Sequence, residues 1–150
     1  PGVIIPGVTS FCGAAAALKA EYTLPNVSQT VILTRMEGRT PVPEREQIES
    51  LAAHGATMVI FLSAGQLEKL SARLIEGGYA PETPAAIVYK ATWPDEKVVR
   101  TTVGELAAAG AREGITKTAL ITVGGFLGDS YDRSKLYAPA FPTGFREASR

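Results

Sequence analysis

Apolar residues in this chain form short, dense runs that alternate with stretches of helical character. The runs are rich in β-branched and apolar residues, which is typical of strands, and lie at 28–35, 57–63, 85–93 and 118–125. The intervening stretches carry apolar residues at helical spacing or many small residues, and lie at 10–20, 43–55, 65–78 and 103–113. One hairpin, in which Pro94 and Asp95 turn the chain into 96–102, interrupts the alternation. The pattern predicts an α/β fold with a mixed β-sheet flanked by helices.

Local signals refine three of the helices. The small residues of SFCGAAAALKA (10–20) permit close packing against a sheet, and we expect Cys12 to pack there as a small apolar side chain. Gly77 and Gly78 predict the end of the helix at 65–78. Thr102 and Glu105 have the T-x-x-E spacing of a capping box, which predicts the start of the helix at 103–113.

Composition and charge narrow the class of protein. The 150 residues suit one domain, and the 15 basic residues balance the 15 acidic ones, so we expect neither nucleic acid nor an anionic membrane as a partner. No apolar run approaches the roughly 20 residues that cross a bilayer. A single cysteine with a single histidine, His54, argues against a zinc site. The expected protein is a cytoplasmic, metal-free, soluble domain.

The stretch TRMEGRTPVPE (34–44) is unusually polar for a segment that follows a strand directly. Arg35 and Arg39 flank Gly38, which permits a tight turn, and the prolines that follow restrict the backbone. These residues predict a stiff cationic loop. An ion pair of either arginine with Glu37 on a solvated loop would explain the same pattern.

Several ordered stretches together resemble the tetrapyrrole methylase family, which uses S-adenosylmethionine. The stretches are IPGVTSF, EYTLP, VIFLSAGQL, PAAIVYKATWPDEKVVRTTVGEL and KTALITVGGFLG. Within the family, TRMEGRTPVPE and the tail SKLYAPAFPTGFR are similar to the subgroup that methylates C11 of precorrin-4 or cobalt-precorrin-4 in cobalamin synthesis. The resemblance therefore implies a methyltransferase that converts S-adenosyl-L-methionine to S-adenosyl-L-homocysteine.

The resemblance also implies a domain organisation. Members of the family have two α/β domains, and the first carries a Gly-rich loop and a GDP-containing motif that do not occur in this sequence. The opening PGVIIPG has no initiator Met and reads as the end of a strand. We therefore expect residues 1–26 to be an inter-domain segment and first helix, and residues 27–150 to be the C-terminal domain. The missing N-terminal domain would be a partner, and the fragment alone would be inactive.

Site residues follow from the same resemblance, and no catalytic residue is assigned. The residues implied to bind the cofactor are Thr9, Ser10, Leu62, Ala91 and Ala119, the last within an adenine-facing edge at 118–120. Four of them have a structural alternative: a helix N-cap for Thr9 or Ser10, a core position for Leu62, and mere small size for Ala91. Since a precorrin carries carboxylate arms, Arg35, Glu37 and Arg39 are the predicted substrate contacts.

Other interpretations stay open at this point. The substrate could be uroporphyrinogen III or a precorrin methylated at another carbon, with or without cobalt. The fragment by itself could be a non-catalytic module for dimerisation or ligand binding. Because members of the family are commonly homodimers, the resemblance implies a homodimer here as well.

Overall fold

The computed structural model describes residues 2–129 and residue 142, and its centre is one five-stranded sheet. The strands are β1 (Val31–Arg35), β2 (Thr57–Phe61), β3 (Pro84–Tyr89), β4 (Lys97–Thr102) and β5 (Ala119–Val123). Their order in the sheet is β1-β2-β5-β3-β4. β1 and β2 are parallel, whereas β5 is antiparallel to β2 and β3, and β3 is antiparallel to β4. The predicted mixed sheet and the predicted hairpin are both confirmed.

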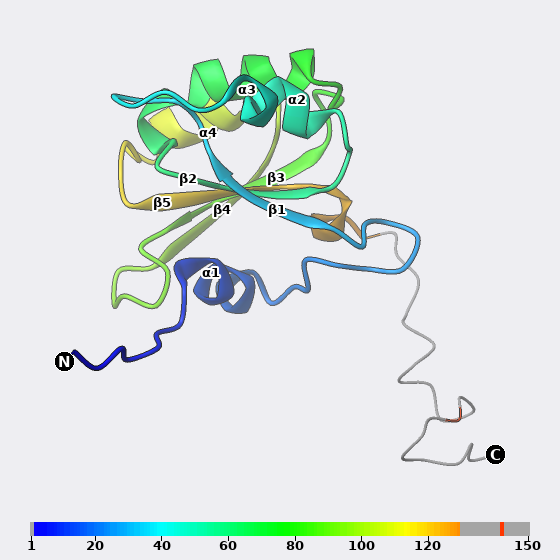
Figure 1. The fold of residues 1–150 in the computed structure, drawn as a ribbon. Helices are drawn as coiled ribbons and strands as arrows, with labels where there is room; N and C mark the ends of the chain where they lie inside the picture. The colour runs from blue at the N-terminus through cyan, green and yellow to red at the C-terminus, as the bar shows by residue number, and fades with distance from the viewer. Residues whose placement is uncertain (1, 130–141, 143–150) are drawn as a thin grey trace.

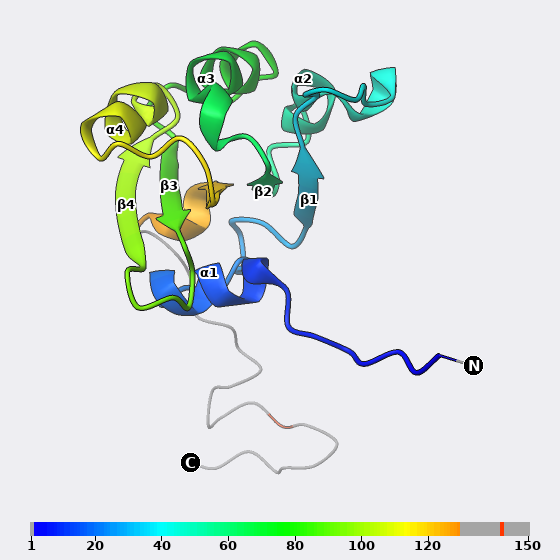
Figure 2. The same cartoon turned by 90° about the vertical axis from the view of Figure 1, so that its left-hand side faces the viewer.

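Helices cover both faces of the sheet. α2 (Ile48–Ala52), α3 (Leu67–Glu76) and α4 (Leu106–Arg112) lie on one face, and α1 (Ser10–Leu18) lies on the other (Figures 1 and 2). Three short 3-10 helices complete the fold: η1 (Glu44–Glu46), η2 (Ala64–Gln66) and η3 (Gly125–Leu127). None of the helices within the described residues is long and apolar enough to cross a membrane.

Burial explains the strand and helix assignments. Four of the five residues of β2 are buried, as expected for an apolar strand with cores on both faces. α3 buries Leu67, Leu70 and Leu74 at helical spacing against the sheet. On the other face, Ala14 and Leu18 of α1 pack with residues of β2, β3 and β5.

The small residues of α1 allow the close approach that the sequence predicted. A Cβ atom on Gly13 would lie 3.1 Å from Thr92 Cγ2 and 3.6 Å from Ala91 Cβ, so a larger residue would push against the β3–β4 turn. The prediction for Cys12 is wrong, since its side chain is exposed. The buried residues of α1 are Ala14 and Leu18, and Cys12 does not share their buried face.

Two predictions of helix boundaries are also wrong. Thr102 is the last residue of β4, paired with Pro84, and Glu105 is itself the N-cap of α4 without a side-chain capping bond. Strand pairing therefore keeps Thr102 in β4, and Thr102 does not serve as the N-cap of α4. The stretch at 43–55 divides into η1 and α2 because Gln47 is extended, with φ −64° and ψ 150°.

The segment before α1 is extended and exposed. Val3, Ile4, Ile5 and Val8 are each at least 85% exposed. The boundary predicted between residues 26 and 27 stays a prediction, and the tail at 134–146 lies outside the described residues, apart from Pro142.

Candidate functional site

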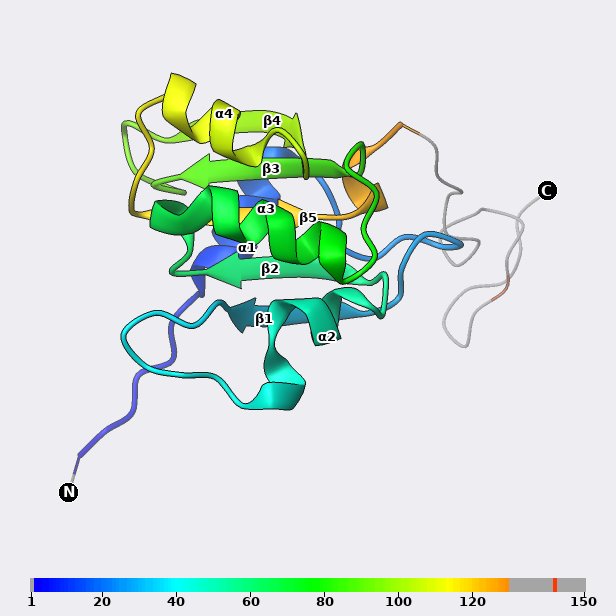
Figure 3. The same cartoon turned by 90° about the horizontal axis from the view of Figure 1, so that it is seen from above.

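One edge of the sheet gathers the loops that the sequence singled out. Arg35 at the end of β1 pairs with Phe61 at the end of β2, and Tyr89 at the end of β3 pairs with Ala119 at the start of β5. The Lys90 N–H donates a 2.9 Å hydrogen bond to the Thr118 carbonyl, which closes this edge between β3 and β5. We call this edge the rim: residues 35–36, 61–63, 89–92 and 118–119. Figure 3 shows β1, β2 and β3 pointing towards it.

Backbone strain is concentrated at the rim. Non-glycine residues with positive φ are uncommon, and within the described residues there are six, four of which lie at the rim. These four are Leu62 (φ 55°), Lys90 (47°), Thr92 (72°) and Thr118 (56°). Strained conformations of this kind cluster at ligand sites, where the surrounding structure holds them in place. The rim is therefore the strongest candidate for a binding site.

Of the predicted cofactor residues, three lie on the rim itself. Leu62 directly follows β2 and is 82% exposed, so the alternative of a core leucine is wrong. Ala91 lies in the β3–β4 turn and Ala119 begins β5, and both are half-buried.

The other two, Thr9 and Ser10, lie at the start of α1 and are exposed. They are within one helical turn of Gly13, which packs against Ala91. Thr9 occupies the N-cap position, but its side chain makes no capping hydrogen bond. Its hydroxyl group is therefore not used for the structural role that the sequence allowed.

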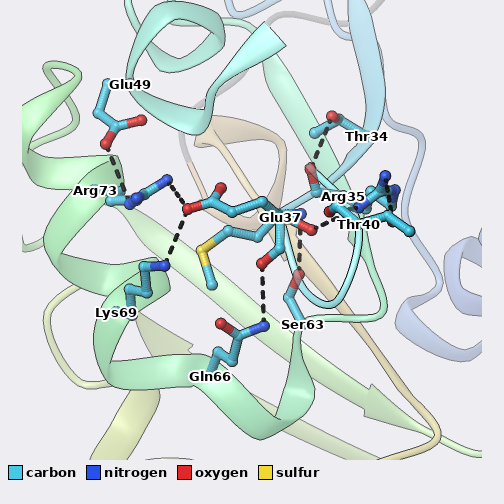
Figure 4. A network of polar contacts seen from close by, with 10 residues as sticks. Thr34, Arg35, Glu37, Thr40, Glu49, Ser63, Gln66, Lys69 and Arg73 are labelled. Atoms are coloured by element: carbon cyan, nitrogen blue, oxygen red, sulfur yellow. Dashed lines mark hydrogen bonds and ion pairs between the residues drawn. The ribbon is translucent and has the colours of Figure 1, made fainter. Parts of the chain in front are cut away.

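The 35–41 loop leaves the rim at the end of β1, and the Arg35 side chain connects the beginning of this loop to its end. The Arg35 guanidinium donates to the Met36 carbonyl (3.2 Å), to both the carbonyl and the hydroxyl of Thr40 (3.3 and 3.1 Å) and to the Pro41 carbonyl (3.1 Å). Figure 4 shows this side chain folded back onto its own loop. The Arg35 donors are thus occupied by the loop backbone and by Thr40.

Glu37 points the other way, towards α3 (Figure 4). Lys69 Nζ donates to Glu37 Oε1 at 3.0 Å, and Arg73 Nη1 lies 2.6 Å from the same oxygen. Arg73 Nε is in turn 3.2 Å from Glu49 Oε1 on α2. The hydrogen bond from Lys69 and, to a lesser extent, the charge of Arg73 hold the pKa of Glu37 below its ordinary value. The alternative pairing of Glu37 with Arg35 or Arg39 is therefore not the one that forms.

Residues from the turn after β2 bind the same loop. The buried Ser63 hydroxyl accepts from the Met36 N–H at 3.3 Å and donates to the Phe61 carbonyl at 2.8 Å. Gln66 Nε2 donates to the Glu37 carbonyl at 3.4 Å, and the Met36 side chain is buried in the core. No sequence signal pointed to Lys69 and Arg73 as partners of Glu37, because the polar face of a helix such as α3 is ordinarily solvated.

Arg39 differs from its neighbours in the loop. It is exposed, and within residues 2–129 no carboxylate or carbonyl engages its guanidinium. Its planar set of donors is therefore available to an anionic ligand.

Fold and rim together define an α/β domain with a candidate binding site at strained turns, where the strands end. The sequence profile of the Tetrapyrrole (Corrin/Porphyrin) Methylases matches residues 2–107. The chain belongs to this family.

Similar proteins include cobalt-precorrin-4 C(11)-methyltransferases. That of Methanocaldococcus jannaschii is 53% identical over 98% of this chain and 57% of its own length. That of Priestia megaterium is 52% identical, with 96% and 57% covered. The precorrin-4 C(11)-methyltransferase of Mycobacterium tuberculosis is 45% identical, with 91% and 55% covered. The chain therefore spans little more than half the length of these relatives.

Solved structures give the same fold. The X-ray structure of a cobalamin biosynthetic enzyme, cobalt precorrin-4 methyltransferase, superposes with a TM-score of 0.81 at 53% identity, covering 83% of this chain and 52% of that one. Uroporphyrin-III C-methyltransferase from Thermus thermophilus, complexed with S-adenyl homocysteine, gives a TM-score of 0.65 at 21% identity, covering 83% and 52%. At that identity the likeness concerns the fold alone.

Proposed function

We propose that the protein to which this chain belongs transfers a methyl group from S-adenosyl-L-methionine to C11 of precorrin-4 or cobalt-precorrin-4. The observation that carries the proposal is the strained, exposed rim in a chain 53% identical to a cobalt-precorrin-4 C(11)-methyltransferase. Because the chain spans 57% of that relative, the activity is proposed for a longer protein with a preceding domain. The chain alone is proposed to be inactive.

The rim has the chemistry that such a cofactor requires. S-adenosylmethionine, when bound, supplies a methyl group on a sulfonium sulfur, which leaves as a neutral thioether. Its adenine and methionine parts need backbone donors and acceptors at close range, next to small side chains. The positive φ of Leu62 turns the backbone out of the β2 strand, and the small side chains of Ala91 and Ala119 leave room at the rim. The residues present therefore fit the cofactor.

The residues of this chain then act by binding and orientation. The exposed Leu62 is proposed to pack against the cofactor, and Thr9 and Ser10 offer hydroxyl groups at the start of α1. Holding donor and acceptor in line contributes roughly 7–11 kcal/mol to such a reaction. Shape, rather than a protein acid or base, is thus the main contribution proposed for this domain.

Arg39 is proposed to bind a carboxylate of the tetrapyrrole. Of the three predicted substrate residues, Arg39 is the one whose charged group is exposed and has no protein partner within residues 2–129. Arg35 and Glu37 already have protein partners. A bidentate contact with one acidic arm would orient the ring at the edge of the rim.

A different tetrapyrrole substrate is the second candidate. A uroporphyrinogen-III C-methyltransferase of Sinorhizobium is 30% identical over 83% of this chain, well below the identity to the C(11)-methyltransferases. We further propose a cytoplasmic homodimer. For the isolated chain, a non-catalytic binding or dimerisation module is the alternative.

Calorimetry and kinetics on the full-length protein test the proposal. Arg39→Ala is expected to raise KM for the tetrapyrrole by about 10-fold or more, as the loss of a charged hydrogen-bonded contact predicts, with the Kd for S-adenosylhomocysteine unchanged. Assays with precorrin-4, cobalt-precorrin-4 and uroporphyrinogen III identify the substrate. Failure of the unmodified protein to bind S-adenosylhomocysteine would overturn the methyltransferase proposal.

A further inference from the structure

We infer that Glu37 is a positioning residue, which fastens the 35–41 loop to α3 and so joins the Arg39 side of the site to the Leu62 turn as one rigid unit. The inference rests on the proposed function and deepens it. It assigns to Glu37 a role that differs from the substrate contact predicted from the sequence.

The loop is held at three points along its length. Arg35 ties the beginning of the loop to its end through the carbonyls of Thr40 and Pro41. Met36 is 2% exposed and anchors the loop in the core. Glu37 is held by two cations of α3, Lys69 and Arg73. Arg39, two residues after Glu37, therefore extends from a loop whose backbone is held in place.

The same loop is bound to the turn that presents Leu62. Ser63, the residue after Leu62, bridges the Phe61 carbonyl and the Met36 N–H through one hydroxyl group. Gln66, at the end of η2, donates to the backbone of Glu37. Because a displacement of either segment would break these bonds, the substrate loop and the cofactor turn are expected to move together.

The lowered pKa of the Glu37 carboxylate suits a positioning residue better than a catalytic base. A general base works best with a pKa near the operating pH, whereas the cations around Glu37 keep its pKa lowered. The groups facing it are Lys69 and Arg73 from α3, with Glu49 of α2 on the far side of Arg73. Figure 4 shows the carboxylate directed at α3 and away from the Arg35 side of the loop.

The test compares Glu37→Gln with Glu113→Gln in the full-length protein. The control removes the same charge from another ion pair, Lys97–Glu113 at 2.8 Å, which links β4 to the end of α4. Four quantities are measured: amide hydrogen exchange in residues 36–40, the Kd for S-adenosylhomocysteine, and kcat and KM for the tetrapyrrole.

Glu37→Gln is expected to speed exchange in the loop and to lower kcat by about 10-fold, since small misplacements of reacting groups are costly. The Kd for S-adenosylhomocysteine should stay within about twofold, and the control should change none of the four quantities. By contrast, Arg39→Ala should act chiefly on KM, which separates positioning from direct contact.

Normal kcat in Glu37→Gln, or exchange as slow as in the unmodified protein, would overturn the inference. If Glu37→Gln fails to fold, Lys69→Gln replaces it, because the Lys69 side chain is 49% exposed and its loss leaves no cavity. An unmodified protein without methyl transfer would instead overturn the proposed function. In that case, hydrogen exchange in the loop still decides whether Glu37 fastens it.

Discussion

Gly77 is the C-cap residue of α3, at a point where this helix packs tightly against α2. A Cβ atom at this position would lie 2.5 Å from Ala52 Cβ and 2.6 Å from the Glu49 carbonyl oxygen. Ordinary contact begins at 3.4 Å, so Gly77→Ala requires α2 to move away by about 0.9 Å. The obstacle is helix backbone, which cannot rotate away as a long side chain would.

The expected free-energy change is the balance of two effects. Overpacking of this kind costs about 1–3 kcal/mol, and a backbone obstacle places Gly77→Ala in the upper part of that range. Gly77 has φ −75°, which alanine adopts freely, so the lower entropy of the unfolded alanine chain returns about 0.4–1 kcal/mol. We therefore expect a net destabilisation of about 2 kcal/mol.

Hydrogen exchange of the most protected amides of β2 and β5 measures this change in the full-length protein. The matched control is Gly38→Ala, because Gly38 has no atom within 4 Å of an added Cβ and should change stability by less than about 0.5 kcal/mol. Equal protection in the two variants would refute the tight approach of α2 and α3. It would also remove the basis for the 3.2 Å contact between Glu49 and Arg73.

Two further predictions concern buried and charged groups. Among the described residues, Thr122 Oγ1 is buried without a hydrogen-bond partner, so Thr122→Val should raise the free energy of unfolding by about 1 kcal/mol or more in urea denaturation; a decrease would mean that the hydroxyl has a partner. Lys69 and Arg73 lower the pKa of Glu37 from 4.5, so its ion pairs stabilise the fold above that pH, and this stability is lost as the pH falls through the lowered value. The difference in stability between the unmodified protein and Glu37→Gln should therefore shrink in acid, and a constant difference would contradict the assignment.

The sequence predicted the elements whose signals are local. β2 lies within the continuous apolar run at 57–63, and α3 lies within 65–78, where leucines recur at helical spacing. The runs predicted at 57–63 and 85–93 extend past the ends of β2 and β3, so Leu62 and Ala91 lie in the turns that follow these strands, while Ala119 begins β5. Their roles as cofactor contacts stay predictions.

Predictions failed where a distant segment competes for the same residue. Thr102 has the spacing of an N-cap, but its pairing with Pro84 keeps it in β4. By contrast, the helix stop predicted at Gly77 and Gly78 is confirmed, since α3 ends at Glu76, but the sequence does not show that α2 lies too close to Gly77 for a Cβ atom. Neither the pairing of Thr102 nor the approach of α2 can be read from residues close in sequence, because each depends on packing between elements.

By itself, the sequence determined the α/β class and the order of the main helices and strands, since apolar periodicity and turn residues act over a few positions. The tertiary structure decided where each strand ends and which residues of the 35–41 loop have free polar groups. It occupied Arg35 and Glu37 with protein partners and left Arg39 exposed, because hydrogen bonds and ion pairs depend on which side chains the fold brings within about 3 Å.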